Sequence, residues 1–239
     1  MGNAPHTSYA RDLEQSRLDG MQTIQEKETR VRHILCFGDS NTYGVDPVLD
    51  RRLARDQRWT GVLRDTLGEG YEIFEEGQGS RTTIWDDPLY PYKNGRDYLI
   101  PCLESHAPLD LVVLALGTND MKHYFQLSPA EIAEGAGVLV RVIQKSDAGS
   151  DGRAPLVLLL SPPLVGKLTH YRELYAGAPE KSRELGKHYK MVAEMYHCAF
   201  LDTARVITTS DADGIHFEHD EHRKLGQAVA AVIRQLLEA

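Results

Sequence analysis

Residues 37–44 read FGDSNTYG, and they follow an apolar, β-prone run, VRHILCF, that ends at Phe37. Such a run predicts a buried strand of an open sheet, so Ser40 falls where that strand stops. Gly, Asp, Ser and Asn are also common in turns and helix caps, because they form local hydrogen bonds there. On this segment alone, a simple turn and a reactive serine are both open interpretations.

Four further apolar runs lie along the chain, separated by segments long enough for crossover helices. They are YEIF at 71–74, LDLVVLAL at 109–116, APLVLLL at 154–160 and AFLD at 199–202. Apolar residues at three- and four-residue spacing predict helices at 58–67, 128–144, 180–197 and 221–239. This alternation predicts a three-layer α/β/α doubly wound, flavodoxin-like domain with a parallel sheet of about five strands. We expect a single domain over residues 31–239, preceded by a polar N-terminal extension over residues 1–30.

The composition is that of an acidic globular protein, with 27 basic and 35 acidic residues and a formal charge of -8. This charge repels a phosphate backbone, so nucleic acid is not an expected partner. Cys36, Cys102 and Cys198 are too widely spaced for a disulfide framework or a paired metal site, and we expect reduced thiols. No stretch reaches the roughly 18 apolar residues that span a bilayer, and the first residues lack the apolar core of a secretory signal. A cytoplasmic location with no membrane partner follows as the expectation.

Ligands of doubly wound domains bind at the carboxyl ends of the strands, and the loops expected there are polar or rich in glycine. A serine at this rim needs a base, usually a histidine that a carboxylate holds in one tautomer. His216 lies in SDADGIHFEHDEH at 210–222, three residues after Asp213. One loop can therefore place both side chains, with the carboxylate at one ring nitrogen and the other ring nitrogen facing Ser40.

Acyl transfer also needs hydrogen-bond donors where negative charge develops on the carbonyl oxygen. Asn119, in LGTND, directly follows a predicted buried strand, so its side-chain amide can point into the cleft. In EEGQGSRTT, the small residues Gly79 and Ser80 let backbone N–H groups approach a ligand closely.

Together, FGDSNTYG, EEGQGSRTT, LGTND and DGIHF resemble, in this order, the four sequence blocks of the SGNH hydrolases, also called the GDSL esterase/lipase family. The resemblance runs from about residue 32 to the C-terminus. It is closest to the bacterial arylesterase and acyltransferase branch, through FEEGQGSRTT, the following DDP, PLDLVVLALGTND and the SPP after the fourth strand. It implies the SGNH-hydrolase fold, short-chain or aryl ester substrates, no cofactor and a homo-oligomer.

Carried over residue by residue, the resemblance makes Ser40 the nucleophile, His216 the general base and acid, and Asp213 the carboxylate that orients it. The oxyanion hole is then formed by the backbone N–H groups of Ser40 and Ser80 and the side chain of Asn119. Family members usually have glycine at the Ser80 position, but a main-chain N–H survives that change. The predicted function is a serine esterase for small carboxylic esters, with acyl transfer to alcohols left open. A carbohydrate acetylesterase is the alternative, and a non-catalytic flavodoxin-like binding protein is a more remote one.

Residues near the predicted rim are candidates for substrate binding. They are Asp39, Tyr43, Gly79 and Trp85. The aromatic rings suit aryl or other apolar groups, although such residues are more often packed core. The segment IWDDPLYPYKNGRDYLIP, residues 84–101, is long for a connection, and we expect it to cover the site or form a subunit contact.

Other site classes find less support. Ser40 is not in a Gly-x-Ser-x-Gly elbow, and its loop has neither the Gly-x-Gly-x-x-Gly spacing nor the Walker lysine of nucleotide sites. His216, His219 and His222 lie beside acids, as in some metal clusters. Three-residue steps fall about 60° short of a helical turn, so these histidines would drift apart on a helix. We therefore expect His219 and His222 on a solvated first turn, and no metal.

Overall fold

Five parallel strands form the central sheet, in the order β4-β1-β5-β6-β7. They are β1 (Arg32–Gly38), β4 (Tyr71–Gly77), β5 (Leu111–Ala115), β6 (Leu156–Leu160) and β7 (Ala199–Leu201). The structure, a computed structural model, describes residues 30–238. From β1 the chain moves first to β4 on one side and then to β5 on the other, which creates the switch point of a doubly wound fold. The predicted fold class is confirmed, whereas the predicted extension lies outside the described residues except for Arg30.

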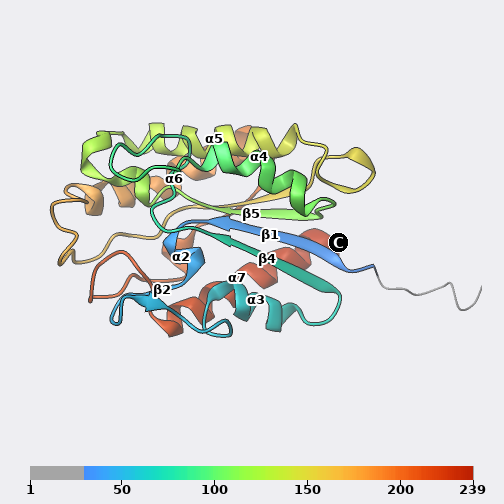
Figure 1. Ribbon diagram of the computed structural model, residues 1–239, viewed down its shortest axis with the longest axis horizontal. Coiled ribbons are helices and arrows are strands. Elements are labelled where there is room, and N and C mark those ends of the chain that lie inside the picture. The colour runs from blue at the N-terminus through green and yellow to red at the C-terminus, as the bar shows by residue number, and fades with distance from the viewer. Residues whose placement is uncertain (1–29, 239) are drawn as a thin grey trace, which may run out of the picture. The chain divides into compact units, whose positions relative to one another are not determined.

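Helices cover both faces of the sheet (Figure 1), with α4, α5 and α6 on one face and α3 and α7 on the other. Their bounds are α3 (Trp59–Leu67), α4 (Gly95–His106), α5 (Pro129–Gln144), α6 (Ala178–Met195) and α7 (His219–Leu237). The four helices predicted from apolar spacing correspond to α3, α5, α6 and α7, and the ends agree to within two residues.

The strands read as unbroken apolar runs because both faces of the sheet are buried. In β1, Leu35 and Phe37 pack under α4, α5 and α6, whereas Ile34 and Cys36 pack against α3 and α7. Because successive side chains point to opposite faces of the sheet, β1 contributes residues to the hydrophobic cores on both faces.

The segment predicted as one long connection at 84–101 is a loop only as far as Asn94, so that expectation was wrong for its second half. Asn94 caps α4 by accepting a hydrogen bond from the backbone N–H of Arg96 at 3.0 Å. Pro101 lies inside α4 and has no N–H to donate, which is why the helical pattern was not recognised there.

Several short elements complete the fold. They are α2 (Ser40–Tyr43), β2 (Val45–Asp46), β3 (Arg51–Arg52), η1 (Asn119–Met121), η2 (His123–Phe125), η3 (Ser150–Gly152) and η4 (Thr203–Arg205). All three cysteines are free thiols, of which Cys198 is the least buried. In the described part of the chain, no helix combines the length and the apolar character needed to cross a membrane.

Candidate active site

Ser40 is the first residue of α2, at the carboxyl end of β1. The Asp39 carboxylate caps this turn by accepting a hydrogen bond from the backbone N–H of Asn41 at 2.9 Å. Gly44 closes the turn in the left-handed region, at φ 85°. Ser40 therefore lies beside the switch point of the sheet, and it keeps 8% of its surface exposed.

His216 and Asp213 reach Ser40 from the loop before α7. Nε2 of His216 lies 3.0 Å from Oγ of Ser40, and Nδ1 lies 2.6 Å from Oδ2 of Asp213. The second carboxylate oxygen, Oδ1, accepts hydrogen bonds from the backbone N–H groups of Ile215 at 2.7 Å and His216 at 2.9 Å. The structure thus brings the three residues into one hydrogen-bonded chain, which can draw a proton from the serine hydroxyl.

Local contacts fix the histidine loop against the serine turn. Gly214 adopts φ 80°, a left-handed conformation that favours glycine, which turns the chain sharply between Asp213 and His216. Nδ2 of Asn41 donates to the carbonyl oxygen of Ile215 at 3.3 Å, so the residue after the serine holds the residue before the histidine.

Burial and hydrogen bonds set the charge of the carboxylates in opposite ways. Burial raises the pKa of Asp213, but hydrogen bonds from His216 and Ile215 outweigh burial, so the pKa lies below its ordinary value. Burial raises the pKa of Asp39 to about 6, although its bond with Asn41 and the nearby His216 oppose the shift. The Asp213 carboxylate beside the histidine therefore stays ionised to a lower pH than the Asp39 carboxylate does.

The Asn119 side chain lies at the carboxyl end of β5, at the start of η1, and is buried. Its Nδ2 donates to the carbonyl oxygen of Arg81 at 3.1 Å, and its Oδ1 accepts from the hydroxyl of Tyr175 at 2.9 Å. Because a carbonyl only accepts, the bond to Arg81 fixes which end of the amide is the nitrogen. The second N–H of this nitrogen is left for a ligand.

The backbone of the predicted oxyanion loop has an unusual conformation at Ser80, where φ is 64°. A side chain added at Gly79 would meet nothing within 4 Å, so this loop borders open space. Within residues 30–238, the N–H groups of Ser40 and Ser80 donate to no protein acceptor. Two backbone donors are therefore free beside the serine turn, as an oxyanion hole requires.

The other predicted substrate-binding residues have partners of their own. Asp39 is 2% exposed and caps α2. The Tyr43 ring, at the end of α2, lies under the guanidinium of Arg52 at 4.2 Å from its centroid. Trp85 is half-buried and packs against the core under α4, α5 and α6.

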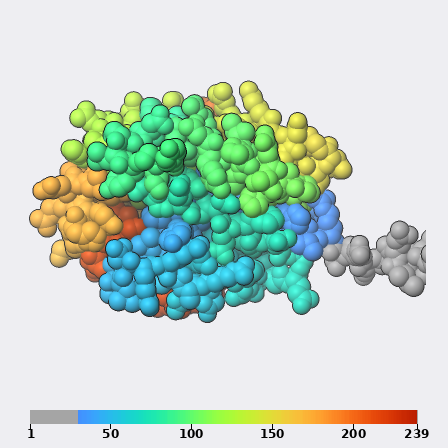
Figure 2. Space-filling model, in the orientation of Figure 1, coloured from blue at the N-terminus to red at the C-terminus, as the bar shows by residue number. Residues whose placement is uncertain are grey.

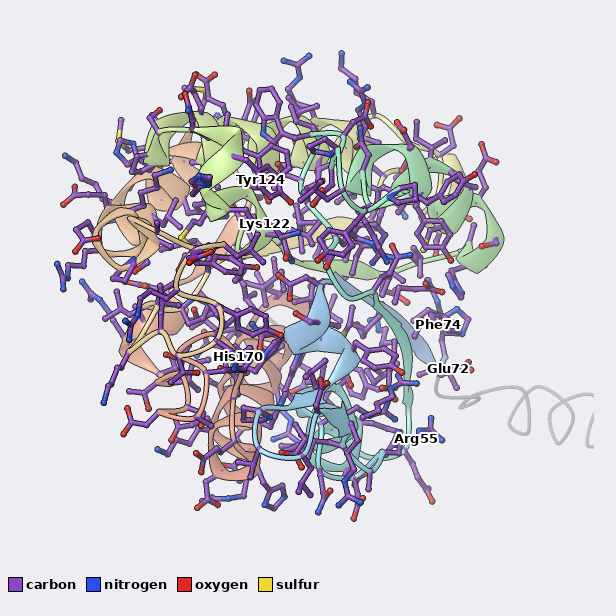
Figure 3. The ribbon with its side chains drawn as sticks, turned by 60° about the vertical axis from the view of Figure 1, so that its left-hand side comes forward. Arg55, Glu72, Phe74, Lys122, Tyr124 and His170 are labelled. Atoms are coloured by element: carbon purple, nitrogen blue, oxygen red, sulfur yellow. The ribbon has the colours of Figure 1, made fainter. Side chains whose placement is uncertain are left out.

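A groove of about 400 Å³ leads to His216 and Asp213. Asp46 and Asp50 line it from the β2–β3 hairpin, and His170 and Tyr171 line it from the segment before α6. Figure 2 shows these walls on the surface, as the blue segment after α2 and the orange segment around residue 170. Figure 3 labels His170, which belongs to the second of these walls. The groove offers hydrogen-bonding groups and an aromatic ring to whatever approaches the histidine.

The three histidines of residues 216–222 do not form a cluster. Both ring nitrogens of His216 face other residues of the site, and His219 is exposed. His222 is fully buried, and its Nδ1 accepts from the backbone N–H of Trp59 at 3.2 Å. The predicted solvated position of His222 was therefore wrong, because this residue takes the place of a side-chain cap for α3, which has none at Arg58.

Among the described residues, one set has ligand atoms close enough together to hold a metal, and it comprises Glu76, Cys102 and His106. Its carboxylate already pairs with Nε2 of His106 at 2.9 Å and accepts from the Tyr98 hydroxyl at 3.1 Å. The Glu76 carboxylate thus has protein partners at both of its oxygens.

Several residues that support the site had no role in the sequence prediction. They are Asn41, Arg81, Asp120 and Tyr175. Asn41 and Asp120 stood inside the quoted motifs, directly after Ser40 and Asn119, and this adjacency was the signal that could have drawn attention to them. Tyr175 lies 56 residues from Asn119, and no motif pointed to it.

The chain is similar to known proteins in both sequence and fold. The sequence matches the GDSL-like Lipase/Acylhydrolase family over residues 36–224. The M. smegmatis aryl esterase is 44% identical, with a TM-score of 0.84 over 87% of this chain and 100% of that chain. Est24, a carbohydrate acetylesterase from Sinorhizobium meliloti, is 41% identical, with a TM-score of 0.84 over 86% of this chain and 100% of that chain. No curated protein sequence matches the chain.

The fold and the site together define a serine hydrolase of the α/β class. The chain belongs to the GDSL-like lipase/acylhydrolase family, whose members are also called SGNH hydrolases, and it is an ester-hydrolysing enzyme.

Proposed function

We propose that the protein hydrolyses small carboxylic esters through an acyl-enzyme on Ser40. The observation that carries the proposal is the chain of contacts from Asp213 to His216 at 2.6 Å and from His216 to Ser40 at 3.0 Å. Free N–H donors of Ser40, Ser80 and Asn119 lie in the neighbouring loops.

The reaction then proceeds in two halves. His216 accepts the hydroxyl proton as Oγ of Ser40 bonds to the ester carbonyl carbon, and the three donors bind the oxyanion that forms. His216 returns that proton to the leaving alcohol as the carbon–oxygen bond breaks. Water then attacks the acyl carbon while His216 accepts its proton, the bond from that carbon to Oγ of Ser40 breaks, and His216 returns the proton to Oγ as the acid is released. An alcohol in place of water would give acyl transfer, which we include as a side activity.

The groove at His216 supports a polar alcohol portion, because its lining includes Asp46, Asp50, His170 and Tyr171. Carboxylates and an aromatic ring suit the hydroxyl groups and faces of a sugar, which favours a carbohydrate acetylesterase as the second candidate. The relatives described as aryl esterase and carbohydrate acetylesterase agree with both candidates.

A substrate panel tests the proposal. We expect hydrolysis of phenyl acetate and of an acetylated monosaccharide, a rate that falls as the acyl chain lengthens, and background rates in Ser40→Ala. Added alcohol should yield the transfer ester. A folded wild-type protein that hydrolyses none of these esters, or prefers long-chain ones, would contradict the proposal. The cytoplasmic location and the homo-oligomer rest on the sequence and the family resemblance, and they remain predictions that fractionation and sedimentation can test.

A further inference from the structure

Asp120 directly follows Asn119, and its carboxylate is fully buried. It accepts hydrogen bonds from the backbone N–H of Thr83, at 3.0 Å to Oδ1 and 3.1 Å to Oδ2. The Thr83 hydroxyl donates to Oδ1 as well. Thr83 is itself fully buried, so the whole contact is shielded from water.

Within the described part of the chain, this carboxylate has no cationic partner. Across residues 30–238, no lysine, arginine or histidine forms an ion pair with Asp120. Burial raises the pKa of Asp120 to about 6, a shift that the Thr83 hydrogen bonds oppose and the charge of Asp39 increases. Burying a carboxylate costs more free energy than burying an amide, and an amide oxygen could also accept hydrogen bonds from Thr83. Stability of the fold alone therefore gives no reason for a carboxylate at this position.

The bond joins the two loops that carry the oxyanion donors. Thr83 lies three residues after Ser80, and Asp120 lies one residue after Asn119. A parallel contact, from Nδ2 of Asn119 to the carbonyl oxygen of Arg81, joins the same two loops nearby. Nη1 of Arg81 also donates to the carbonyl oxygen of Gly38 at 2.8 Å, which ties the Ser80 loop to the end of β1.

Oxyanion donors act only when they point to where the charge develops, and displacements of about 0.5 Å already matter. Charge-assisted hydrogen bonds are shorter and stronger than neutral ones, so they hold such a geometry better. The carboxylate bonds both the backbone and the side chain of Thr83, which fixes the spacing of the loops as well as their orientation.

We propose that Asp120 is a positioning residue, which, by binding Thr83, fixes the Ser80 N–H and the Asn119 amide relative to one another. The inference rests on the proposed oxyanion role of these donors. Asp120 touches no substrate, and its effect passes through Thr83 and Asn119. Loosening the contact weakens an interaction made in the transition state and leaves ground-state binding intact, so kcat falls while KM stays nearly constant.

The test compares Thr83→Val, Asp120→Asn and Asp120→Ala with a matched control, Thr60→Val. Thr60 is also a fully buried threonine, and its hydroxyl also donates to a carboxylate, Oε2 of Glu75 at 2.9 Å. Each protein is assayed for kcat and KM on phenyl acetate, with its active sites counted by the end point of fluorophosphonate labelling. Thermal unfolding of each variant is measured in parallel.

We expect kcat per active site to fall about tenfold in Thr83→Val and between ten- and a hundredfold in Asp120→Ala, with Asp120→Asn between them. KM should change less than threefold, and Thr60→Val should lose stability but keep its kcat. Thr83→Ser, which retains the hydroxyl, should keep most of the wild-type kcat.

The inference is overturned if the Thr83 and Asp120 variants lose stability but keep the wild-type kcat per active site, or if KM alone rises. If Asp120→Ala does not fold, Thr83→Val and Asp120→Asn still decide the matter. The Asn119→Ala variant distinguishes the oxyanion role of Asn119 from the positioning role of Asp120. A normal kcat in that variant would refute the oxyanion role of Asn119, on which the inference rests, and an inactive wild type would refute the proposed function. A slow Asn119→Ala beside a normal Thr83→Val refutes only the role of Asp120.

Discussion

Replacing Asp213 by Asn should block the histidine as a base, and the geometry of the site shows why. Oδ1 of Asp213 accepts from the backbone N–H groups of Ile215 at 2.7 Å and His216 at 2.9 Å. In Asp213→Asn the carbonyl oxygen must stay at these two donors. The new NH₂ group then occupies the position of Oδ2, which lies 2.6 Å from Nδ1 of His216.

An NH₂ group only donates, so Nδ1 must become the acceptor and the ring proton must move to Nε2. Nε2 faces the Ser40 hydroxyl at 3.0 Å, and in this tautomer it cannot take the serine proton. A base held in the wrong tautomer costs about 10⁴ in kcat, which corresponds to about 5.5 kcal/mol of transition-state stabilisation.

The assay measures kcat on phenyl acetate near pH 8, with active sites counted by fluorophosphonate labelling. Asp211→Asn is the matched control, because it removes the same charge from an exposed position in the same loop and should leave kcat unchanged. A loss below tenfold in a folded Asp213→Asn protein would refute the reasoning, since the carboxylate would then not control the tautomer of His216.

Three further predictions concern the oxyanion hole and the stability of the fold. Asn119→Ala removes one donor and should lower kcat by about 10² to 10³, with KM nearly unchanged, and a smaller effect would place Asn119 outside the reaction. Ser80→Gly relieves a left-handed conformation, φ 64°, and should raise stability by up to about 1 kcal/mol, seen as a few degrees in thermal unfolding, and an unchanged or lower unfolding temperature would contradict this. His222→Gln should flatten the acid loss of stability, because burial lowers the pKa of His222 to about 3 from the value of 6.5 that an unfolded chain has. The unfolded chain therefore binds a proton that the folded one does not, and stability that is complete above pH 6.5 falls by up to about 1.4 kcal/mol per pH unit as pH drops towards 3. Asp39 and Asp120, whose pKa values are raised to about 6, act in the opposite direction below pH 6, but they are common to both proteins. The prediction would be contradicted if the free energy of unfolding, measured in urea, fell by the same amount in wild type and variant between pH 7 and 4.

The strands were predictable because parallel strands are buried on both faces, and such strands read as unbroken apolar runs. Four helices were predictable because the face that each one buries against the sheet carries apolar residues at three- and four-residue spacing. The roles of Ser40 and His216 could be predicted because each residue lies in a short motif, and the four motifs in order resemble the sequence blocks of the SGNH hydrolases.

Contacts between distant segments could not be predicted in this way. Asp120 and Thr83 are 37 residues apart, and periodicity carries no information on such a pair. His222 resembled a residue of a solvated helical turn, yet it is buried because α3 needs an acceptor for the N–H of Trp59. Helix α4 was partly missed because Pro101 lies inside it, where a proline removes a backbone hydrogen bond and is therefore not expected.

The central claim is that His216 activates Ser40 as a nucleophile, and covalent labelling tests it most directly. The protein, Ser40→Ala and His216→Ala are each treated with a serine-directed fluorophosphonate, and the products are examined by intact mass and peptide mapping. We predict a single adduct on Ser40 in the wild type, none in Ser40→Ala and a much slower reaction in His216→Ala. A folded wild-type protein that forms no adduct, or forms it on another residue, would contradict the account.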